Sequence, residues 1–344
     1  MQLGIVGLSR SGKSTLFEAV TGSQHEMAKK GDLRIGTINV PDSRVDVLTD
    51  MYKPRKTIYA QLQFVLPHRT DTGDKAKKGD AGLTPVRTSD ALIQVVRNFT
   101  ESGGERPSPA GDFAALNQEL VFADLVVVEK RLERVEADFK RGRKDVADEM
   151  ALLKKCLALL EAETPLRRDP EIANDPLLKG FTLLSAKPVL VVFNNEDEDP
   201  DMPDNGGVCQ AEPCMVMRAR LEQELAQMSE EDAEAFLEEF GITDPAMDRM
   251  IRRSYELLGR ISFFTVGDDE VRAWTIREGT LAPDAADVIH SDIKRGFIRA
   301  EVVHYDDLMD AGSHAEARKR GTVRLEGRNY VVRDGDIINF RFNV

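Results

Sequence analysis

Glycines, a lysine and hydroxyl side chains follow one another at fixed spacing close to the N-terminus. Residues 7–14 have the sequence GLSRSGKS, which satisfies the pattern GxxxxGK[ST]. Gly7 and Gly12 let the backbone curl so that successive N–H groups point at a phosphate. Lys13 would reach the β- and γ-phosphates, and Ser14 would offer its hydroxyl to Mg²⁺. The pattern predicts that the chain binds the phosphates of a nucleoside triphosphate.

The segments around this loop are of the kinds that would position it. Met1–Val6 is a short apolar strand, and a helix is expected from about Gly12, which is the order of a mononucleotide-binding βα unit. Further apolar, β-branched runs predict a parallel sheet covered on both faces, hence an α/β fold. These runs are Leu62–Leu66, Ala91–Val96 and Val189–Phe193. The predicted phosphate-binding residues are Gly7, Ser9, Arg10, Ser11, Gly12, Lys13, Ser14 and Thr15, with Lys13 and Ser14 catalytic and Ser14 the metal ligand.

Base recognition is expected directly after the third of these runs. Asn194 and Asp197 have the spacing of the Asn-Lys-x-Asp motif of G proteins, in which the carboxylate accepts hydrogen bonds from guanine. Asn195 stands in place of the lysine whose stem packs on the base. We therefore predict Asn194 and Asp197 as base-binding residues. The alternative is that Asp197 belongs to a solvated acidic loop, because the acidic run continues beyond it.

The hydrophobic period changes between residues 112 and 163. Apolar residues recur at spacings of three and four on both sides of Gly142, which predicts an antiparallel coiled-coil hairpin with a turn at that glycine. The two seams are Leu125, Val128, Leu132, Val135 and Phe139, then Val146, Met150, Leu153, Leu157 and Leu160. The predicted tip, residues 140–144, has the sequence KRGRK. Its cations either contact RNA phosphates or form a solvated end.

From Ser262 onward the pattern is of short alternating segments around a helix candidate at Pro283–Lys294. Such a set predicts an α+β module of about 80 residues. The predicted strands are Ser262–Val266, Val271–Ile276, Thr322–Leu325, Tyr330–Val332 and Ile337–Phe342.

Composition restricts the class of protein. The 344 residues carry a net charge of −13, which argues against a general nucleic-acid coat and leaves only a local basic patch for an RNA partner. Three cysteines fit a reducing compartment, and no apolar run approaches the roughly 20 residues of a membrane helix. The first residues have no pattern of a secretory signal. We expect a cytoplasmic protein with no membrane partner.

The chain resembles the YchF/Ola family of Obg-related P-loop NTPases (TRAFAC class) over nearly its whole length. The sequences EVRAWT at 270–275, GFIRAE at 296–301, DGD at 334–336 and FRFNV at 340–344 resemble the family's TGS domain, a ubiquitin-like β-grasp module. Residues 123–133 resemble its coiled-coil insert, and GIVGL at 4–8 matches the start of its P-loop.

This resemblance implies a three-part architecture. Residues 1–111 and 164–261 would form the P-loop nucleotide-binding domain, 112–163 the helical hairpin and 262–344 the TGS domain. It also implies a Mg²⁺-dependent NTPase that prefers ATP to GTP and acts around the ribosome, with the hairpin tip and TGS domain meeting rRNA. Asn194 aligns with the family's motif asparagine, and Asp197 falls where the family usually has glutamate.

Three motifs of the family are missing from this chain. Its Ser-Ala-Lys, which lines the base, would fall at 218–220, where the sequence is RAR. Its Asp-x-x-Gly would fall at 66–69, where the sequence is LPHR, and its switch I threonine would lie between Thr21 and Gly36, where 23–30 are SQHEMAKK. These groups hold Mg²⁺ and meet the γ-phosphate, so their loss should slow hydrolysis while leaving phosphate binding intact. His68 could orient a water molecule, or it is an ordinary loop residue.

Three hypotheses follow. The first is a slow ATPase that acts at the ribosome. The second is a paralogue that binds a nucleotide without hydrolysing it and works as an interaction module. The third is a GTP-preferring GTPase. A small-molecule kinase also uses a P-loop, but the hairpin and the C-terminal module have no place in that hypothesis.

Overall fold

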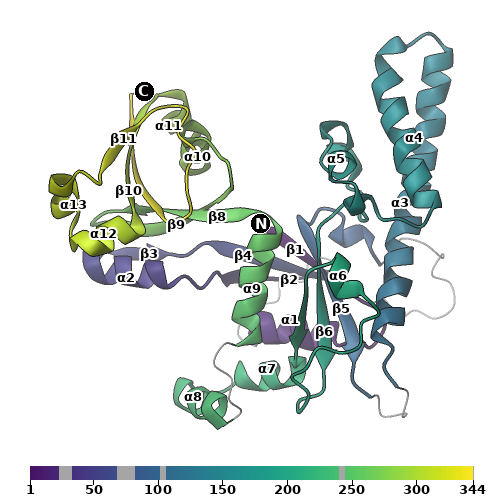
Figure 1. Ribbon diagram of the computed structural model, residues 1–344, viewed down its shortest axis with the longest axis horizontal. Helices are drawn as coiled ribbons and strands as arrows, with labels where there is room; N and C mark the ends of the chain where they lie inside the picture. The colour runs from purple at the N-terminus through teal and green to yellow at the C-terminus, as the bar shows by residue number, and fades with distance from the viewer. Residues whose placement is uncertain (23–32, 68–81, 101–105, 240–244, 344) are drawn as a thin grey trace. The chain divides into compact units, whose positions relative to one another are not determined.

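The computed structural model describes residues 1–22, 33–67, 82–100, 106–239 and 245–343. The chain forms two compact units (Figure 1). The first unit consists of Met1–Ile38 and Gln63–Met250, and the second of Asn39–Leu62 and Ile251–Val344. Each unit contains one of two six-stranded sheets.

The strands within the described residues are β1 (Gln2–Val6), β2 (Leu33–Asn39), β3 (Lys56–Ile58), β4 (Gln61–Pro67), β5 (Ala91–Asn98), β6 (Val189–Asn195), β7 (Cys214–Met217), β8 (Arg260–Val266), β9 (Glu270–Arg277), β10 (Phe297–His304), β11 (Arg324–Glu326) and β12 (Asp336–Phe342). The α-helices there are α1 (Lys13–Thr21), α2 (Ser43–Tyr52), α3 (Pro109–Lys140), α4 (Ala147–Glu161), α5 (Pro170–Ala173), α6 (Val208–Ala211), α7 (Ala219–Leu225), α8 (Glu230–Glu239), α9 (Ala246–Leu257), α10 (Ala282–Ile289), α11 (Ser291–Arg295), α12 (Tyr305–Ala311) and α13 (His314–Arg320).

The sheet of the first unit has the strand order β2-β4-β1-β5-β6-β7. Its strands β4, β1, β5, β6 and β7 pair in parallel. The first seven residues of β5 and all of β6 are buried, which is typical of parallel strands covered on both faces. The predicted α/β fold with a parallel-rich sheet is confirmed. Three of its four predicted strands lie within observed ones, and the fourth, Met1–Val6, exceeds β1 by Met1 alone.

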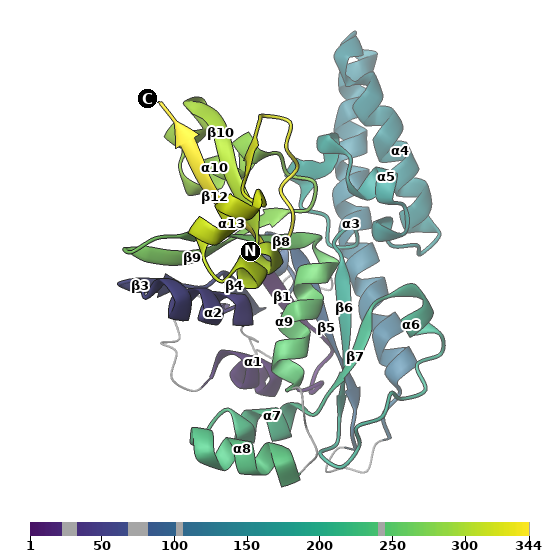
Figure 2. The same cartoon turned by 60° about the vertical axis from the view of Figure 1, so that its left-hand side comes forward.

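Helices cover both faces of this sheet (Figures 1 and 2). Leu116, Leu120 and Ala123 of α3 pack with Val208 of α6 into the core on one face, while α1 and α7 pack together on the other. Because the strands are parallel, all their carboxyl ends meet at one edge of the sheet. That edge follows β1, β5 and β6, the strands that precede the predicted site residues.

The helical hairpin consists of α3 and α4, which lie side by side in both views (Figures 1 and 2). Gly142, with φ 97°, occupies the turn between them, as predicted. Most of the predicted seam is buried in one core, but Phe139 is 39% exposed. Leu152 and Cys156 are buried in that core and were not predicted. The first helix also begins at Pro109 rather than near residue 112, because proline fits the first turn of a helix.

The sheet of the second unit has the order β11-β10-β12-β8-β9-β3. Strand β12 pairs antiparallel with β10 and parallel with β8, and β8 and β9 form an antiparallel hairpin. The predicted strand at Tyr330–Val332 is wrong, since this segment makes only an isolated bridge between Val331 and Leu281. The predicted helix at Pro283–Lys294 is two helices, because His290 is extended and its side chain caps α11.

Residues 39–62, which supply α2 and β3, pack within the second unit although they precede it by some 200 residues in the chain. Strand β3 adds a parallel edge strand next to β9, with Thr57 opposite Val271. Nothing in the periodicity of this segment distinguishes it from the rest of the N-terminal region. The three-part division by residue number stays a prediction, and the two compact units follow contacts instead. Within the described ranges, no helix is both long and apolar enough to span a bilayer.

Candidate nucleotide-binding site

The turn between β1 and α1 has the backbone of a phosphate-binding loop. Arg10 and Gly12 both have positive φ angles, 59° and 91°. Gly12 is the N-cap of α1, and none of the described side chains caps this helix end, where the first N–H groups can bind an anion. The carbonyl of Gly12 accepts the helix's first hydrogen bond, from the N–H of Leu16 at 2.9 Å. The sequence pattern therefore folds into the predicted strand, loop and helix.

Close contacts require a glycine at both Gly7 and Gly12, and the positive φ angle adds a second requirement at Gly12. A Cβ on Gly7 would lie 2.6 Å from both the Ser11 hydroxyl and the Val95 carbonyl oxygen. A Cβ on Gly12 would lie 2.1 Å from Nδ2 of Asn194. Both distances are shorter than any tolerable contact, so larger residues would fill the loop that the glycines leave open.

Lys13 and Ser11 present polar groups to the loop. The ammonium of Lys13 donates hydrogen bonds to the carbonyl oxygens of Gly7 at 2.8 Å and Leu8 at 2.5 Å. The hydroxyl of Ser11 is buried and has no hydrogen-bond partner among the described residues. A buried hydroxyl in that state calls for an additional partner. An anion in the loop would supply one for Ser11 and would lie beside the ammonium of Lys13.

The remaining predicted residues line the loop with different accessibilities. Ser9, Arg10 and Ser14 are exposed, and Thr15 is half-buried in the first turn of α1. The accessible hydroxyl of Ser14 fits a role as a Mg²⁺ ligand beside bound phosphates. The described residues contain no group of three His, Cys, Asp or Glu side chains that could hold a metal ion alone. Ser14 and the oxygens of a bound nucleotide would together hold a Mg²⁺ ion here.

Asn194, at the end of β6, ties the loop to the segment expected to line the base. Its Nδ2 donates to the carbonyl of Ser11 at 3.1 Å, and its Oδ1 accepts from the N–H of Ala219 at 3.1 Å. The side chain is buried and uses its amide at both ends. The structure thus brings the predicted Asn194 to the P-loop, but as a brace between the loop and Ala219.

Asp197 lies two residues beyond the strand and is half-buried. Its carboxylate is 3.8 Å from the guanidinium of Arg220, while Arg218 donates to its main-chain carbonyl at 3.1 Å. Burial raises the pKa of Asp197, and the charge of Arg220 opposes that shift. A base carrying N–H donors would have to compete with Arg220 for this carboxylate.

Asn195 occupies the position of the motif lysine, but hydrogen bonds within the protein hold its side chain. It is buried, and its Nδ2 donates to the carbonyls of Asp199 at 3.1 Å and Asp201 at 2.7 Å. Its Oδ1 accepts from Asn98 at 3.0 Å. The side chain thus fixes the acidic loop to the end of β5, and it has no freedom to pack on a base.

One residue of the site was missed by the sequence. A ring carbon of Phe99 lies 3.9 Å from the position of a Cβ on Gly12, beside Asn194. The signal that could have found it is its place just after β5, at the edge where ligands bind in parallel sheets. Of the missing-motif positions, Leu66 is buried and Pro67 ends β4. His68, Arg69 and the segment 23–30 lie outside the described residues.

Comparisons with known proteins agree with this architecture. The family model YchF-GTPase_C, described as a protein of unknown function (DUF933), matches residues 260–343. A Bacillus subtilis (strain 168) protein named Ribosome-binding ATPase YchF is 40% identical, with 99% of each chain covered. The protein of that name from Escherichia coli O157:H7 is 36% identical over 99% of each chain.

Solved structures give the same result. The structure titled as the Schizosaccharomyces pombe YchF GTPase matches with a TM-score of 0.84 and 30% identity, covering 99% of this chain and 97% of that one. A GTP-binding protein from Pyrococcus horikoshii OT3 has a TM-score of 0.60 at 16% identity, which supports the fold alone. The fold is that of P-loop NTPases. On this full-length similarity in sequence and structure, the chain belongs to the YchF family.

Proposed function

We propose that the chain binds a nucleoside triphosphate in the loop 7–15 and acts as a ribosome-associated NTPase in the cytoplasm. The observation that carries the first part is the open loop between Gly7 and Gly12, which holds an unpartnered hydroxyl and a lysine ammonium. The names of relatives at 36–40% identity, Ribosome-binding ATPase YchF, support the second part.

ATP is the preferred nucleotide in this proposal, although the name of one related structure says GTPase. Guanine recognition in the Asn-Lys-x-Asp motif needs a free carboxylate and a lysine stem over the base. Here Arg220 lies beside Asp197, and the side-chain amide of Asn195 makes three hydrogen bonds within the protein. Guanine presents N–H donors at the position where adenine presents an acceptor. The pair between Asp197 and Arg220 therefore weakens the binding of guanine without affecting that of adenine.

Hydrolysis is expected to be slow. Phosphoryl transfer depends on charge neutralisation by Mg²⁺ and a lysine, and on a water molecule that is positioned for attack. The chain retains Lys13 and Ser14, while the sequence at the Asp-x-x-Gly position supplies neither a carboxylate nor a glycine. The same missing groups support the alternative, a module that binds a nucleotide without hydrolysing it. The rate of hydrolysis distinguishes this module from a slow NTPase.

The test compares the wild type with Lys13→Ala in nucleotide titration and in single-turnover hydrolysis. We expect Lys13→Ala to weaken ATP binding by about a hundredfold, because a charge-assisted contact to phosphate is lost. Wild type should bind ATP at least as tightly as GTP. GTP binding tenfold tighter than ATP would refute the base preference. Equal phosphate release by wild type and variant would refute the enzyme and leave the binding module.

The tip of the hairpin is a candidate ribosome contact, and its cations are not equivalent. Arg143 is ion-paired with Asp138 at 3.1 Å and Asp145 at 2.9 Å, and Arg141 lies 3.7 Å from Asp138. Lys140 and Lys144, by contrast, make no ion pair within the part of the chain that the structure describes. The lysines can therefore meet phosphates without first breaking an internal pair.

We expect Lys140→Ala/Lys144→Ala to reduce co-sedimentation with ribosomes more than Arg141→Ala/Arg143→Ala does. Both double variants remove two positive charges, so the arginine pair is the matched control. The lysine variant should also show a shallower salt dependence, since fewer counterions are released on binding. Equal losses in the two variants would mean that only the total charge of the tip matters. No loss in either would place the contact elsewhere.

A further inference from the structure

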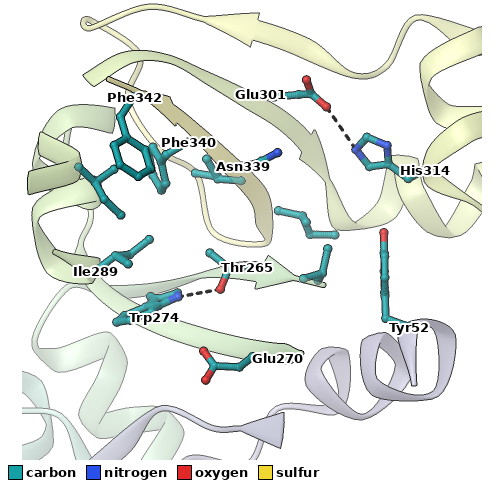
Figure 3. A pocket seen from close by; sticks show the side chains of 14 residues that line it. Tyr52, Thr265, Glu270, Trp274, Ile289, Glu301, His314, Asn339, Phe340 and Phe342 are labelled. Carbon is teal, nitrogen blue, oxygen red and sulfur yellow. Dashed lines mark hydrogen bonds and ion pairs between the residues drawn. The ribbon is translucent and has the colours of Figure 1, made fainter. Parts of the chain in front are cut away.

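The second unit contains a cavity of about 520 Å³, and none of the predicted nucleotide-binding residues lines it (Figure 3). Strands β12 and β8 pair at Ile337 and Phe264. The residues that follow these two in each strand, Thr265 and Val266 in β8 and Ile338 to Phe340 in β12, line the cavity. Their side chains help to enclose a space of the size that small ligands occupy.

The two ends of this cavity differ in chemistry. Figure 3 shows Trp274, Ile289, Phe340 and Phe342 together at one end. The indole N–H of Trp274 already donates to the hydroxyl of Thr265 at 3.0 Å. A ligand at this end therefore does not need to accept a hydrogen bond from the indole. Phe342 is 46% exposed, which leaves a wide apolar surface open to an entering ring.

The opposite end carries Tyr52, His314 and Glu301 (Figure 3). The hydroxyl of Tyr52 is buried and has no hydrogen-bond partner among the described residues. Burial raises the pKa of Tyr52, so the hydroxyl is neutral and keeps its proton to donate. A buried hydroxyl without a partner costs free energy that a bound acceptor would recover.

The carboxylates that line this cavity already have cationic partners. Glu301 is buried, and its carboxylate contacts Arg318 and Arg341 at 2.5 Å each and His314 at 3.8 Å. The carboxylate of Glu270 lies 3.8 Å from Arg272. A cationic ligand would therefore lose hydration without finding a free carboxylate, and the three arginines are not among the residues that line the cavity, where an anion would meet them. A neutral group that both accepts and donates hydrogen bonds suits Tyr52 and the carboxylate oxygens better.

We propose that this cavity binds a neutral aromatic compound with an amide next to its ring. The ring lies at the end walled by Trp274 and Phe340. The amide carbonyl accepts from the Tyr52 hydroxyl, and the amide N–H faces Glu301 or Asn339. This chemistry is that of a free aromatic amino-acid amide or of an aromatic residue within a partner's peptide.

The single tryptophan of the chain makes the proposal directly measurable, because emission excited at 295 nm comes from Trp274 alone. The probes are N-acetyl-phenylalaninamide, the capped peptide acetyl-Gly-Phe-Gly-amide and, as a ring-free control, N-acetyl-alaninamide. We expect saturable changes in emission with the phenylalanine probes, with a Kd of about 1 mM for a compound of this size. Calorimetry on the same samples detects binding that leaves the emission unchanged. Binding of the capped peptide alone would identify a protein partner, and equal binding of both a free compound.

Tyr52→Phe tests the amide contact and removes only the unpartnered hydroxyl. We expect it to weaken probe binding about fivefold without lowering the stability of the protein. The matched control is Tyr59→Phe in the same unit, whose hydroxyl donates to Asp46 and does not line the cavity. Lys13→Ala should bind the probe as the wild type does, which separates this site from the nucleotide loop. No binding of either phenylalanine probe, or equal binding by wild type and Tyr52→Phe, would overturn the proposal.

Discussion

Replacing Gly12 with alanine is expected to weaken ATP binding by about a hundredfold and to lower the free energy of unfolding by about 3 kcal/mol. The added Cβ would lie 2.1 Å from Nδ2 of Asn194, and the φ of 91° is strained for any residue with a side chain. Asn194 would have to move and give up its hydrogen bonds to Ser11 and Ala219. One methyl group thus both closes the loop and removes its brace.

Gly142→Ala is the matched control for this experiment. Gly142 has a φ of 97°, but a Cβ there would meet no described atom within 4 Å. It should therefore cost only the backbone strain, about 1 kcal/mol, and leave nucleotide binding unchanged. Calorimetric titration with ATP and chemical denaturation measure both effects. If Gly12→Ala bound ATP as the wild type does, the loop between Gly7 and Gly12 would not be the phosphate site.

Asp124→Asn is expected to be the most destabilising substitution away from the nucleotide loop, at about 3–5 kcal/mol. Asp124 lies in α3 and its side chain is fully buried. Its carboxylate accepts from the N–H groups of Leu184 at 2.9 Å and Ser185 at 2.6 Å, and from Arg87 at 3.1 Å. Burial raises the pKa of Asp124 and these hydrogen bonds oppose the shift. An asparagine keeps the volume but turns an NH₂ group toward donors and leaves Arg87 without its buried counter-charge.

This variant separates a buried ionic contact from a surface one. The control is Asp269→Ala, which removes a pair with Arg55 in which both side chains are more than four-fifths exposed. Water screens such a pair, so denaturant titration should find the control indistinguishable from the wild type. If Asp124→Asn also left the free energy of unfolding unchanged, the hydrogen bonds from α3 to the segment before β6 would contribute nothing to stability.

Local patterns in the sequence were sufficient for the elements whose signals are themselves local. The P-loop was predicted because strand, glycine spacing and helix are consecutive. The hairpin was predicted because its seams repeat at helical spacing on each side of Gly142. The strand predicted at Tyr330–Val332 is wrong for the opposite reason, because a strand also needs a partner that is distant in the chain. Among the described residues this segment pairs through an isolated bridge, between Val331 and Leu281. Strand β10 was not predicted, although it is the central partner of β11 and β12.

The roles of the two predicted base-binding residues depend partly on contacts that the sequence does not reveal. The spacing of Asn194 and Asp197 predicted that both residues follow the run Val189–Phe193. The structure has Asn194 within the end of β6 and Asp197 two residues beyond that strand. The spacing could not indicate that Asn194 braces the loop, nor that Arg220 lies beside the carboxylate of Asp197. These partners are 23 or more residues away from them in the chain, and only the parallel order of β1, β6 and β7 brings their ends to one edge.

The phosphate loop at 7–14 is the part of this protein that the sequence determined by itself. Its function depends on the backbone angles and on N–H groups of consecutive residues, which eight letters are enough to specify. What the loop is braced by, and which groups surround a base, were decided by the tertiary structure, because they depend on strands far apart in the chain. The cavity in the second unit was also decided there, since Tyr52, Trp274 and Glu301 meet only after residues 39–62 have packed with the C-terminal sheet.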